Sequence, residues 1–402
     1  MKKKLGVAAS AVILLWAGAV LVARLAASPA DADLLPPPYA AVPVDDGFAD
    51  FLAMGKALDA TSEERTFLNS QTEKGPLDAA RVRGLLARNR ETLKRFRLLS
   101  SRAVFRDPAY GDPSGINFNT PVPQFFPVVT AARLLVLEAE LLLAEGRPAE
   151  ALERAQTVYR VGRLLAGERQ PLITHLVGAL LIDLSARRVR AAATAPRVPA
   201  PARIAAARLL AAPTGAVRGL QDGLRYEYAS SAWLADHLAE ILPESDDRQY
   251  TRSTSLLLRA ALAGGLYSRG QTKTLFAGKA REDISAAGEP CAAGKVAPFR
   301  PLAIYPRPNL VGVIIYDMGA PNYAPLFKRR CAADWRAAEA GLAAALAAYR
   351  AERGAWPARL DELMPKYVDA VPADPFTGAP IAYSAETGQL STSGTDVFGK
   401  PL

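Results

Sequence analysis

Histidine, cysteine and methionine are scarce in this chain of 402 residues, which has two histidines, two cysteines and four methionines. Because only His175 and His237 are available, a zinc site with a His-x-x-x-His spacing is excluded. No Gly-x-Ser-x-Gly nucleophile elbow occurs, and the segment 288–295 lacks the glycine spacing and the Ser or Thr of a phosphate loop. We therefore predict no catalytic, cofactor-binding or metal-ligating residues, and no enzymatic activity.

The two histidines have structural interpretations that the sequence favours over functional ones. His175 interrupts an apolar run, where a buried and hydrogen-bonded histidine is the usual arrangement. His237 lies next to Asp236 and close to Glu240, so it could act as a base. A solvated His–Glu pair on an amphipathic helix explains the same pattern, and neither histidine is predicted to be a site residue.

The chain lacks a concentrated charge of either sign. Its formal net charge is +9, and its arginines are spread through stretches of helical periodicity rather than clustered beside aromatic residues. Binding to nucleic acid requires such a clustered basic face, so no nucleic-acid partner is predicted. Solvated helix faces explain the positive excess, and a weak attraction to anionic lipid headgroups is the alternative.

One long stretch without charge stands at the N-terminus. Three lysines at positions 2–4 precede the uncharged residues 5–23, and Arg24 follows them. At about 1.5 Å per residue this stretch spans roughly 30 Å, the thickness of the hydrocarbon core of a bilayer. Flanking lysines place the N-terminus in the cytoplasm. We predict a single-pass anchor over residues 1–27 in a bacterial inner membrane, with the bulk of the chain in the periplasm or outside.

A cleaved signal peptide is the alternative to the anchor. Its hydrophobic region is usually about 7–15 residues long, which is shorter than the one here, and Ser28-Pro29-Ala30 is a poor cleavage site. Either arrangement exports everything that follows. Residues 28–44 carry five prolines among small residues, so a stiff and extended linker is expected before the folded part.

Residues 45–330 are predicted to form an α-helical domain, because they are rich in alanine, leucine and arginine with apolar residues at helical spacing. The predicted helices are 77–99, 129–145, 148–165, 171–195, 216–242 and 254–276. Two stretches rich in proline and glycine, 105–127 and 279–308, are predicted to be irregular. A further apolar stretch, 309–327, is expected to be a short helix or a buried strand.

The joint inside residues 129–165 carries the sequence Ala-Glu-Gly-Arg-Pro-Ala-Glu-Ala-Leu. It resembles the turn within a tetratricopeptide repeat, which implies two antiparallel helices at this place. No second copy follows at the 34-residue period of such repeats, so an array is not predicted.

The end of the chain carries its most specific pattern. Apolar residues at spacings of three and four predict a long helix that is capped by Asp334 and stopped by Gly354. A short leucine-bearing turn is expected at 357–363, and a small β-hairpin at 381–391. We therefore predict a mainly α chain that ends in a small α+β module, residues 331–402.

Several features of this module occur together in one known family. They are the long helix, the turn Gly354-x-Trp356-Pro357, the run Val371-Pro372-x-Asp374-Pro375-Phe376-x-Gly378 and the ending Gly394-x-Asp396. In this combination residues 332–402 resemble the globular part of the major pseudopilin of type II secretion systems. The resemblance implies a helix packed on short antiparallel strands, and an association with secretion or envelope machinery.

The tail also departs from the pseudopilin pattern in two ways. A pseudopilin places its helix directly after a processed hydrophobic N-terminus, whereas more than 300 residues precede the helix here. Pseudopilins bind calcium with several acidic residues, of which only Asp396 has a counterpart. A calcium site needs about 6–8 oxygen ligands, so neither pilus assembly nor calcium binding is predicted.

The two cysteines, Cys291 and Cys331, both follow the predicted anchor and are therefore exported. An oxidising compartment favours their pairing as a disulfide. The bond would tie the root of the tail helix to the irregular segment before it. Two buried thiols that never meet are the alternative.

Two classes of function remain after these exclusions. The first is a membrane-anchored, non-catalytic binding or scaffold protein with a protein partner, in which the tail is a docking module. The alternative is an envelope enzyme with a site in the loops 107–127 or 288–308. A pocket that gathers Asp107, Asp112 or Asn117 near a histidine would favour the enzyme, and a shallow groove on the helices would favour binding. We predict the first class.

Overall fold

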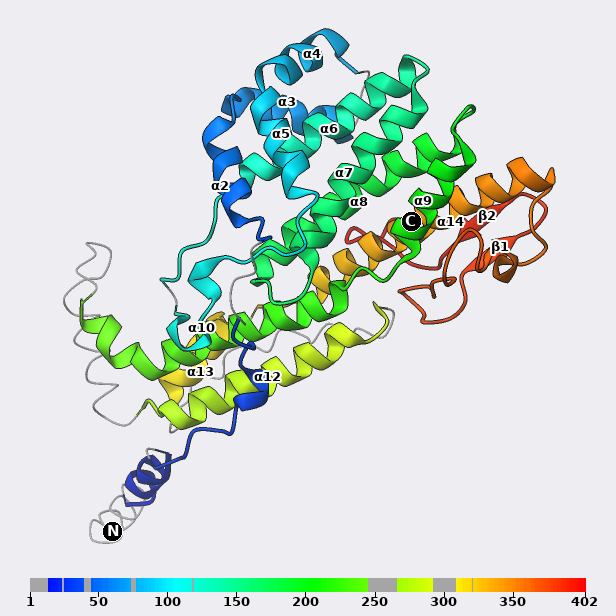
Figure 1. Ribbon diagram of the computed structural model, residues 1–402. Coiled ribbons are helices and arrows are strands. Elements are labelled where there is room, and N and C mark those ends of the chain that lie inside the picture. Colours follow the sequence, from blue (N-terminus) through cyan, green and yellow to red (C-terminus); the bar gives the residue numbers. More distant parts are fainter. Residues whose placement is uncertain are drawn as a thin grey trace.

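The computed structural model describes residues 14–23, 25–39, 45–73, 77–117, 119–244, 266–291, 309–319 and 321–402. They form a mainly helical molecule, and the strands among them make one two-stranded antiparallel sheet near the C-terminus. The prediction of a mainly α chain with short antiparallel strands in its tail is thereby confirmed. In Figure 1 the sheet lies beside the C-terminal helix, at the right-hand edge of the molecule.

Four short helices form the first layer of the bundle. They are α2 (Phe48–Ala57), α3 (Ser62–Glu73), α4 (Ala79–Arg88) and α5 (Arg90–Leu99). Their apolar faces meet in one core around Phe51, Leu85 and Phe96, which they share with the long helices behind them. This packing is what apolar residues at helical spacing predict.

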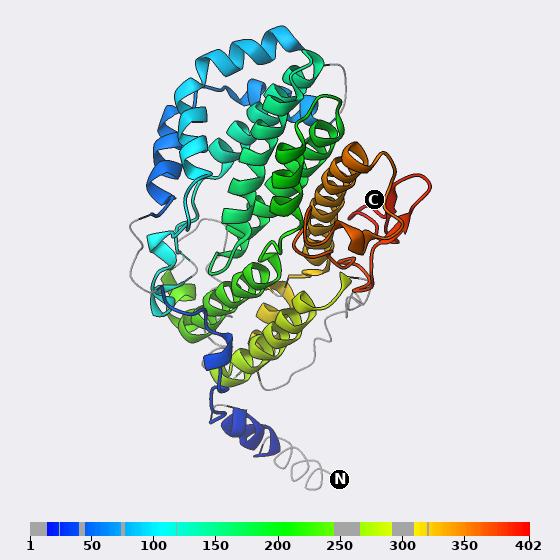
Figure 2. The same ribbon diagram turned by 45° about the vertical axis from the view of Figure 1, so that its right-hand side comes forward.

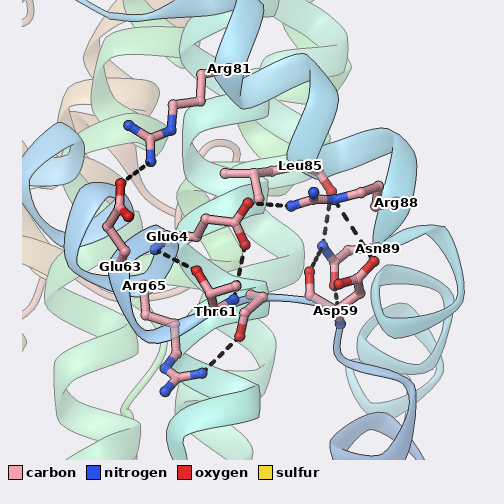
Figure 3. A network of polar contacts seen from close by, with 10 residues as sticks. Asp59, Thr61, Glu63, Glu64, Arg65, Arg81, Leu85, Arg88 and Asn89 are labelled. Carbon is pink, nitrogen blue, oxygen red and sulfur yellow. Dashed lines mark hydrogen bonds and ion pairs between the residues drawn. The ribbon is translucent and has the colours of Figure 1, made fainter.

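The stretch 77–99 forms two helices, so the prediction of a single helix there is wrong. Asn89 ends α4 and precedes α5, and its side chain is fully buried. Its Oδ1 accepts a hydrogen bond from the N–H of Asp59 at 2.9 Å, and its Nδ2 donates to the carbonyl of Asp59 at 2.8 Å (Figure 3). The break follows from these bonds to the α2–α3 connection, which the leucine spacing does not reveal.

Three long helices form the centre of the molecule: α6 (Phe126–Ala144), α7 (Pro148–Ala166) and α8 (Leu172–Thr194). They run side by side in Figure 1 and confirm the predicted helical hairpin and the buried helix after it. Gly162 of α7 and Gly178 of α8 face each other, and a Cβ on Gly178 would lie 2.6 Å from the carbonyl oxygen of Gly162. Two glycines therefore allow these backbones to approach closely.

A second layer contains α10 (Ala216–Glu244) and α12 (Arg269–Gly288), which run side by side in Figure 1. The 3-10 turn η1 (Ala32–Leu34) and helix α13 (Leu310–Gly319) pack on them through a small apolar cluster around Phe276. Helix α10 confirms the helix predicted at this place. Helix α13 resolves the apolar stretch after residue 309 as a helix rather than a strand.

Helix α12 lies further along the chain than predicted. Of the helix predicted at 254–276, residues 254–265 lie outside the described part of the chain. The irregular stretch predicted at 279–308 is wrong up to Gly288, because none of its residues before that position is a glycine or a proline, and α12 continues. Residues 292–308 also lie outside the described part.

The C-terminal helix α14 (Ala324–Arg353) begins earlier than predicted, because Pro325 occupies its first turn, where proline is tolerated. Asp334 is therefore inside the helix, and the prediction that it caps the N-terminus is wrong. Thr214 donates a hydrogen bond from its Oγ1 to Asp334 at 2.9 Å instead. Gly354 has a φ of 79° and ends the helix in the left-handed conformation, as predicted.

Helix α9 (Ala200–Ala211) was not predicted from the sequence. Pro199 and Pro201 indicated an interruption there, but Pro199 is the N-cap and Pro201 lies in the first turn. The predicted boundary between the helical domain and the tail module, at residue 331, falls inside α14.

The tail after α14 contains the turn η5 (Leu360–Leu363) and the strands β1 (Ala382–Ser384) and β2 (Gln389–Ser391). The strands pair antiparallel with Tyr383 opposite Leu390, which confirms the predicted hairpin. The buried carboxylate of Asp374 holds the proline-rich loop in place. It accepts hydrogen bonds from the N–H of Phe376 and from the Oγ1 of Thr392, both at 2.8 Å.

Tail and helical body share one hydrophobic core. Figure 2 shows α14 between the helices of the body and the rest of the tail. Trp335 and Leu342 of α14 belong to the same buried cluster as Tyr159 and Leu210 of the body, and Phe376 of the tail belongs to it as well. The tail is therefore built into the body rather than attached through a linker.

Within the described residues, no helix combines the length and the apolar character needed to cross a membrane. Residues 14–23 are helical, and the anchor predicted at 5–23 extends into residues 1–13, which lie outside the described part. The carbonyl of Ala23 accepts a hydrogen bond from Ser268, the N-cap of α12. The anchor thus stays a prediction.

Candidate binding groove

A groove of about 730 Å³ runs along the junction between the helical body and the tail. Its lining comes from the C-terminal end of α8, from α9, from one face of α14 and from the tail. The lining residues are Arg190, Thr194, Arg203, Glu339, Ala343, Leu346, Ala347, Arg350, Ala351, Trp356, Thr387, Gly388, Gln389 and Leu390. Its volume falls in the range of about 300–1,000 Å³ that is usual for ligand sites.

Small side chains of α14 form the floor of the groove. Ala343, Ala347 and Ala351 follow one another at intervals of four residues, which places them on one face of the helix. The same helix turns its opposite face, with Trp335 and Leu342, into the core. Alanines on the outer face leave room that larger residues would fill.

Three arginines from three helices line the groove. Arg190 of α8 pairs with Glu339 of α14. Arg203 of α9 is half-buried and donates to the carbonyl oxygens of Ala193 and Ala195, each at 2.9 Å. These carbonyls belong to the end of α8, where intrahelical partners are missing and a cation is favoured.

Arg350 is held at the other end of the groove by an aromatic ring. Its guanidinium carbon lies 4.5 Å from the centre of the Trp356 ring, which is within the range of a cation–π contact. The stacking occupies one face of the guanidinium plane and leaves its N–H edge directed elsewhere.

The hairpin turn closes the tail side of the groove against Trp356. Gly388 has a φ of 72°, and a Cβ there would lie 2.6 Å from the Trp356 ring. Tyr383 donates a hydrogen bond to the carbonyl of Pro357 at 2.9 Å, which fixes the strand to the turn after α14. Only glycine therefore fits at this contact, and the wall of the groove is rigidly built.

The charges along the groove are unbalanced. Glu339 is its one carboxylate, and that side chain is committed to Arg190. In the part of the chain that the structure describes, neither Arg203 nor Arg350 forms an ion pair. The groove therefore carries positive charge that an anionic occupant would neutralise.

The predicted disulfide between Cys291 and Cys331 is present, with a Cα–Cα distance of 6.3 Å. It joins α14 to Cys291, three residues beyond the end of α12, on a different part of α14 from the groove. The guanidinium of Arg330 donates to the carbonyl of Glu289 at 3.2 Å beside it. The bond therefore anchors the start of the tail helix to the second layer.

His175 is a core residue, as predicted. It is fully buried, and its Nδ1 lies 3.0 Å from the carbonyl oxygen of Ala166. Burial lowers the pKa of His175 to about 4, so the ring is neutral near pH 7. Among the described residues its Nε2 has no hydrogen-bond partner.

The predicted solvated pair of His237 is not what the structure shows. The ring of His237 stacks on Trp233 with 4.4 Å between the ring centres, and its Nδ1 lies 2.9 Å from the carbonyl oxygen of Trp233. Asp236 forms ion pairs with Arg269 and Lys273 instead. The ring of His237 is thus packed on its own helix rather than solvated beside a glutamate, and Asp236, the carboxylate next to it in sequence, is engaged by α12.

The polar side chains of Asp107, Asp112 and Asn117 form hydrogen bonds within their own loop, 107–127. The carboxylates of Asp107 and Asp112 accept hydrogen bonds from the N–H groups of Ala109 and Ser114, two residues further on. Asn117 accepts in the same way from its own turn at 2.8 Å. These are turn-forming bonds, and within the described residues none of these side chains bonds to either histidine.

Asp396, the one acidic residue near the position of the pseudopilin calcium site, also bonds to its own loop. Its Oδ1 accepts from the N–H groups of Phe398 at 2.8 Å and Lys400 at 2.9 Å. Among the described residues no group of three or more histidine, cysteine, aspartate or glutamate side chains is placed to hold a metal ion.

Comparison of the chain with protein-family models, with curated proteins and with solved structures gave no match. The groove therefore has to be interpreted from its own residues. Its three arginines are far apart in the sequence, on three helices, and none stood out from the other arginines of the chain. The tail helix, the turn around Trp356 and the hairpin were the parts of its lining that the sequence singled out.

Proposed function

We propose that the chain is a membrane-anchored envelope protein whose exported part binds a protein partner without catalysis. The observation that carries the proposal is the open groove along the junction of body and tail, whose walls come from both parts. A fixed groove between rigid elements is suited to recognition, because little order has to be gained when a partner binds.

The sequence of the first residues supports the location. Lysines at positions 2–4 and the uncharged stretch 5–23 favour an anchor with its N-terminus in the cytoplasm. The disulfide between Cys291 and Cys331 agrees with an oxidising compartment on the other side. We place the folded part in the periplasm or outside the cell.

The resemblance of the tail to a pseudopilin supports a role beside secretion or envelope machinery. The long helix with its Gly354 stop, the loop around Asp374 and the hairpin all match the pattern that carries the resemblance. Because α14 is also a core helix of the body, the tail acts here as a fixed docking module. The alternative, an envelope enzyme with a site in 107–127 or 288–308, is favoured by no contact among the described residues of these loops.

Photo-crosslinking in intact cells tests this proposal. A photoreactive amino acid is placed singly at exposed positions spread over the body and the tail, including Thr387 at the rim of the groove and Arg90 on α5. We expect at least one position to give a discrete crosslinked product with a single envelope protein, identified by mass spectrometry. Products that are absent at every position would contradict a binding role.

A further inference from the structure

We propose that the groove holds an extended, acidic segment of a partner protein. This inference rests on the proposed binding function and gives that function its ligand class. It is carried by the charge of the groove, by the distance between its arginines and by the shape of its floor.

Charge selects the chemistry of the ligand. Arg203 and Arg350 line the groove, and within the described residues neither has a carboxylate partner. The N–H groups of Arg203 already donate to the carbonyl oxygens of Ala193, Ala195 and Ala347, so Arg203 contributes positive charge and Arg350 contributes the available N–H groups. Arginine donates to carboxylates through two parallel N–H groups, and the stacking of Arg350 on Trp356 orders its guanidinium before a ligand arrives. Glutamate or aspartate side chains are therefore the complementary groups.

The spacing of the arginines selects an extended ligand rather than a small anion. Arg190 is fixed near Glu339 by an ion pair through one terminal nitrogen, and its side chain stays 54 % exposed. Arg350 lies eleven positions further along the same helix α14 as Glu339. At the rise of an α-helix this separates the two ends of the groove by about 16 Å. One phosphate or carboxylate cannot contact both ends, whereas about five residues of extended chain can, at roughly 3.3 Å per residue.

The floor and wall of the groove suit such a chain. The alanines at 343, 347 and 351 leave a smooth surface for a backbone, and Trp356 offers a flat apolar face beside Arg350. The fixed turn at Gly388 keeps the opposite wall in place. An acidic peptide can therefore lie along α14 with its carboxylates directed to Arg190 and Arg350 at the two ends.

The binding test uses the full chain in a mild non-ionic detergent and a fluorescein-labelled octapeptide of glutamate. Fluorescence anisotropy measures the dissociation constant for the wild type, for Arg350→Glu and for the control Arg90→Glu. Both variants change the net charge by the same amount, and Arg90 is an exposed residue at the start of α5, outside the groove. We expect Arg350→Glu to weaken binding about fivefold or more, and Arg90→Glu by less than about twofold.

A second variant keeps the test independent of the charge at position 350. Ala351→Trp adds a large side chain to the exposed edge of the floor and leaves all three arginines in place. We expect it to weaken binding to a similar extent, with an unchanged circular dichroism spectrum. A lysine octapeptide should bind neither the wild type nor Ala351→Trp.

Three results would overturn the inference: no binding of the glutamate peptide, equal weakening by Arg350→Glu and Arg90→Glu, or displacement of the peptide by inorganic phosphate but not by chloride at equal ionic strength. The second result would indicate a long-range charge effect only, and the third a site for a small anion. The proposed function is judged separately by the crosslinking. Discrete products at other positions, with none at Thr387, would keep the binding role and reject the groove as its site.

Discussion

Trp335 is the largest side chain that the core encloses almost completely, with 2 % of its surface exposed. Trp356, by contrast, is half-buried at the groove. We expect Trp335→Ala to lower the free energy of unfolding by about 3–5 kcal/mol, because it leaves a cavity in the shared core. Trp356→Ala should cost only about 1–2 kcal/mol, because less of its surface is removed from water. Urea denaturation followed by circular dichroism measures both, and equal losses would contradict this assignment of core and rim.

The buried ring of His175 makes the stability of the folded chain depend on pH. Burial lowers its pKa to about 4 from 6.5, so between these values the unfolded chain binds a proton that the folded chain does not. Stability attributable to this residue is therefore complete above about pH 6.5 and is lost as the pH falls. By about pH 5 the loss should reach roughly 2 kcal/mol.

The measurement for His175 compares urea denaturation at about pH 7.5 and pH 5. His175→Gln should reduce the loss of stability between the two pH values, because glutamine does not titrate. An unchanged loss in His175→Gln would show that other groups cause the pH dependence.

Residue-level prediction succeeded where a residue type has one strong preference. Gly354 was expected to end a helix in the left-handed conformation, and it does, with a φ of 79°. Asp334 was expected to be a cap, and is instead held inside α14 by Thr214 and Arg330. An aspartate has several possible partners, and only the folded chain decides which of them lies near.

The crossing of α7 and α8 is one of the close backbone contacts between elements that the glycines reveal. A Cβ on Gly178 would lie 2.3 Å from the backbone nitrogen of Ala166, so the helices would have to move apart. We expect Gly178→Ala to lower the free energy of unfolding by about 1–3 kcal/mol. Gly84→Ala on α4 is the control, since nothing lies within 4 Å of its Cβ, and it should raise stability by about 0.5–1 kcal/mol. A change in the free energy of unfolding with the same sign in both variants would contradict the close approach of α7 and α8 at Gly178.

The disulfide links Cys331 of α14 to Cys291 in the segment after α12, across 40 residues of sequence. In the chain-entropy account, removing a bond with this loop length should cost about 4 kcal/mol of stability. The double variant Cys291→Ser, Cys331→Ser should therefore unfold at lower urea concentration. Peptide mapping under non-reducing conditions should find the two cysteine peptides joined in the wild type. Recovery of both as free, alkylated thiols would contradict the pairing.

At the level of elements, the apolar periodicity predicted most helices. It missed helix boundaries that are determined by a buried polar contact. It found α6, α7, α8 and α10 close to their observed ends. It joined α4 and α5, because the burial of Asn89 against the α2–α3 connection leaves no trace in the leucine spacing. It also missed α9, because prolines that open a helix look the same in sequence as prolines that end one.

At the scale of the whole molecule, the sequence predicted a helical domain and a separate tail module, and the fold packs these two parts together. The tail was predicted as a separate module over residues 331–402, whereas it shares one core with α7, α8 and α9. The groove could not be predicted, because it exists only where three distant arginines and the hairpin turn meet on α14. Its location at that junction is the reason for treating body and tail as one binding unit.

The proposed role in the envelope requires that the folded part is exported, and a reporter fusion tests this export directly. Alkaline phosphatase is joined after residue 60, beyond the predicted anchor and linker, and a fluorescent protein that matures only in the cytoplasm is joined at the same position. An active phosphatase together with a dark fluorescent fusion is the predicted result, because lysines that flank an uncharged stretch favour an N-terminus in the cytoplasm. An inactive phosphatase with a bright fluorescent fusion would place the folded part in the cytoplasm and contradict the account.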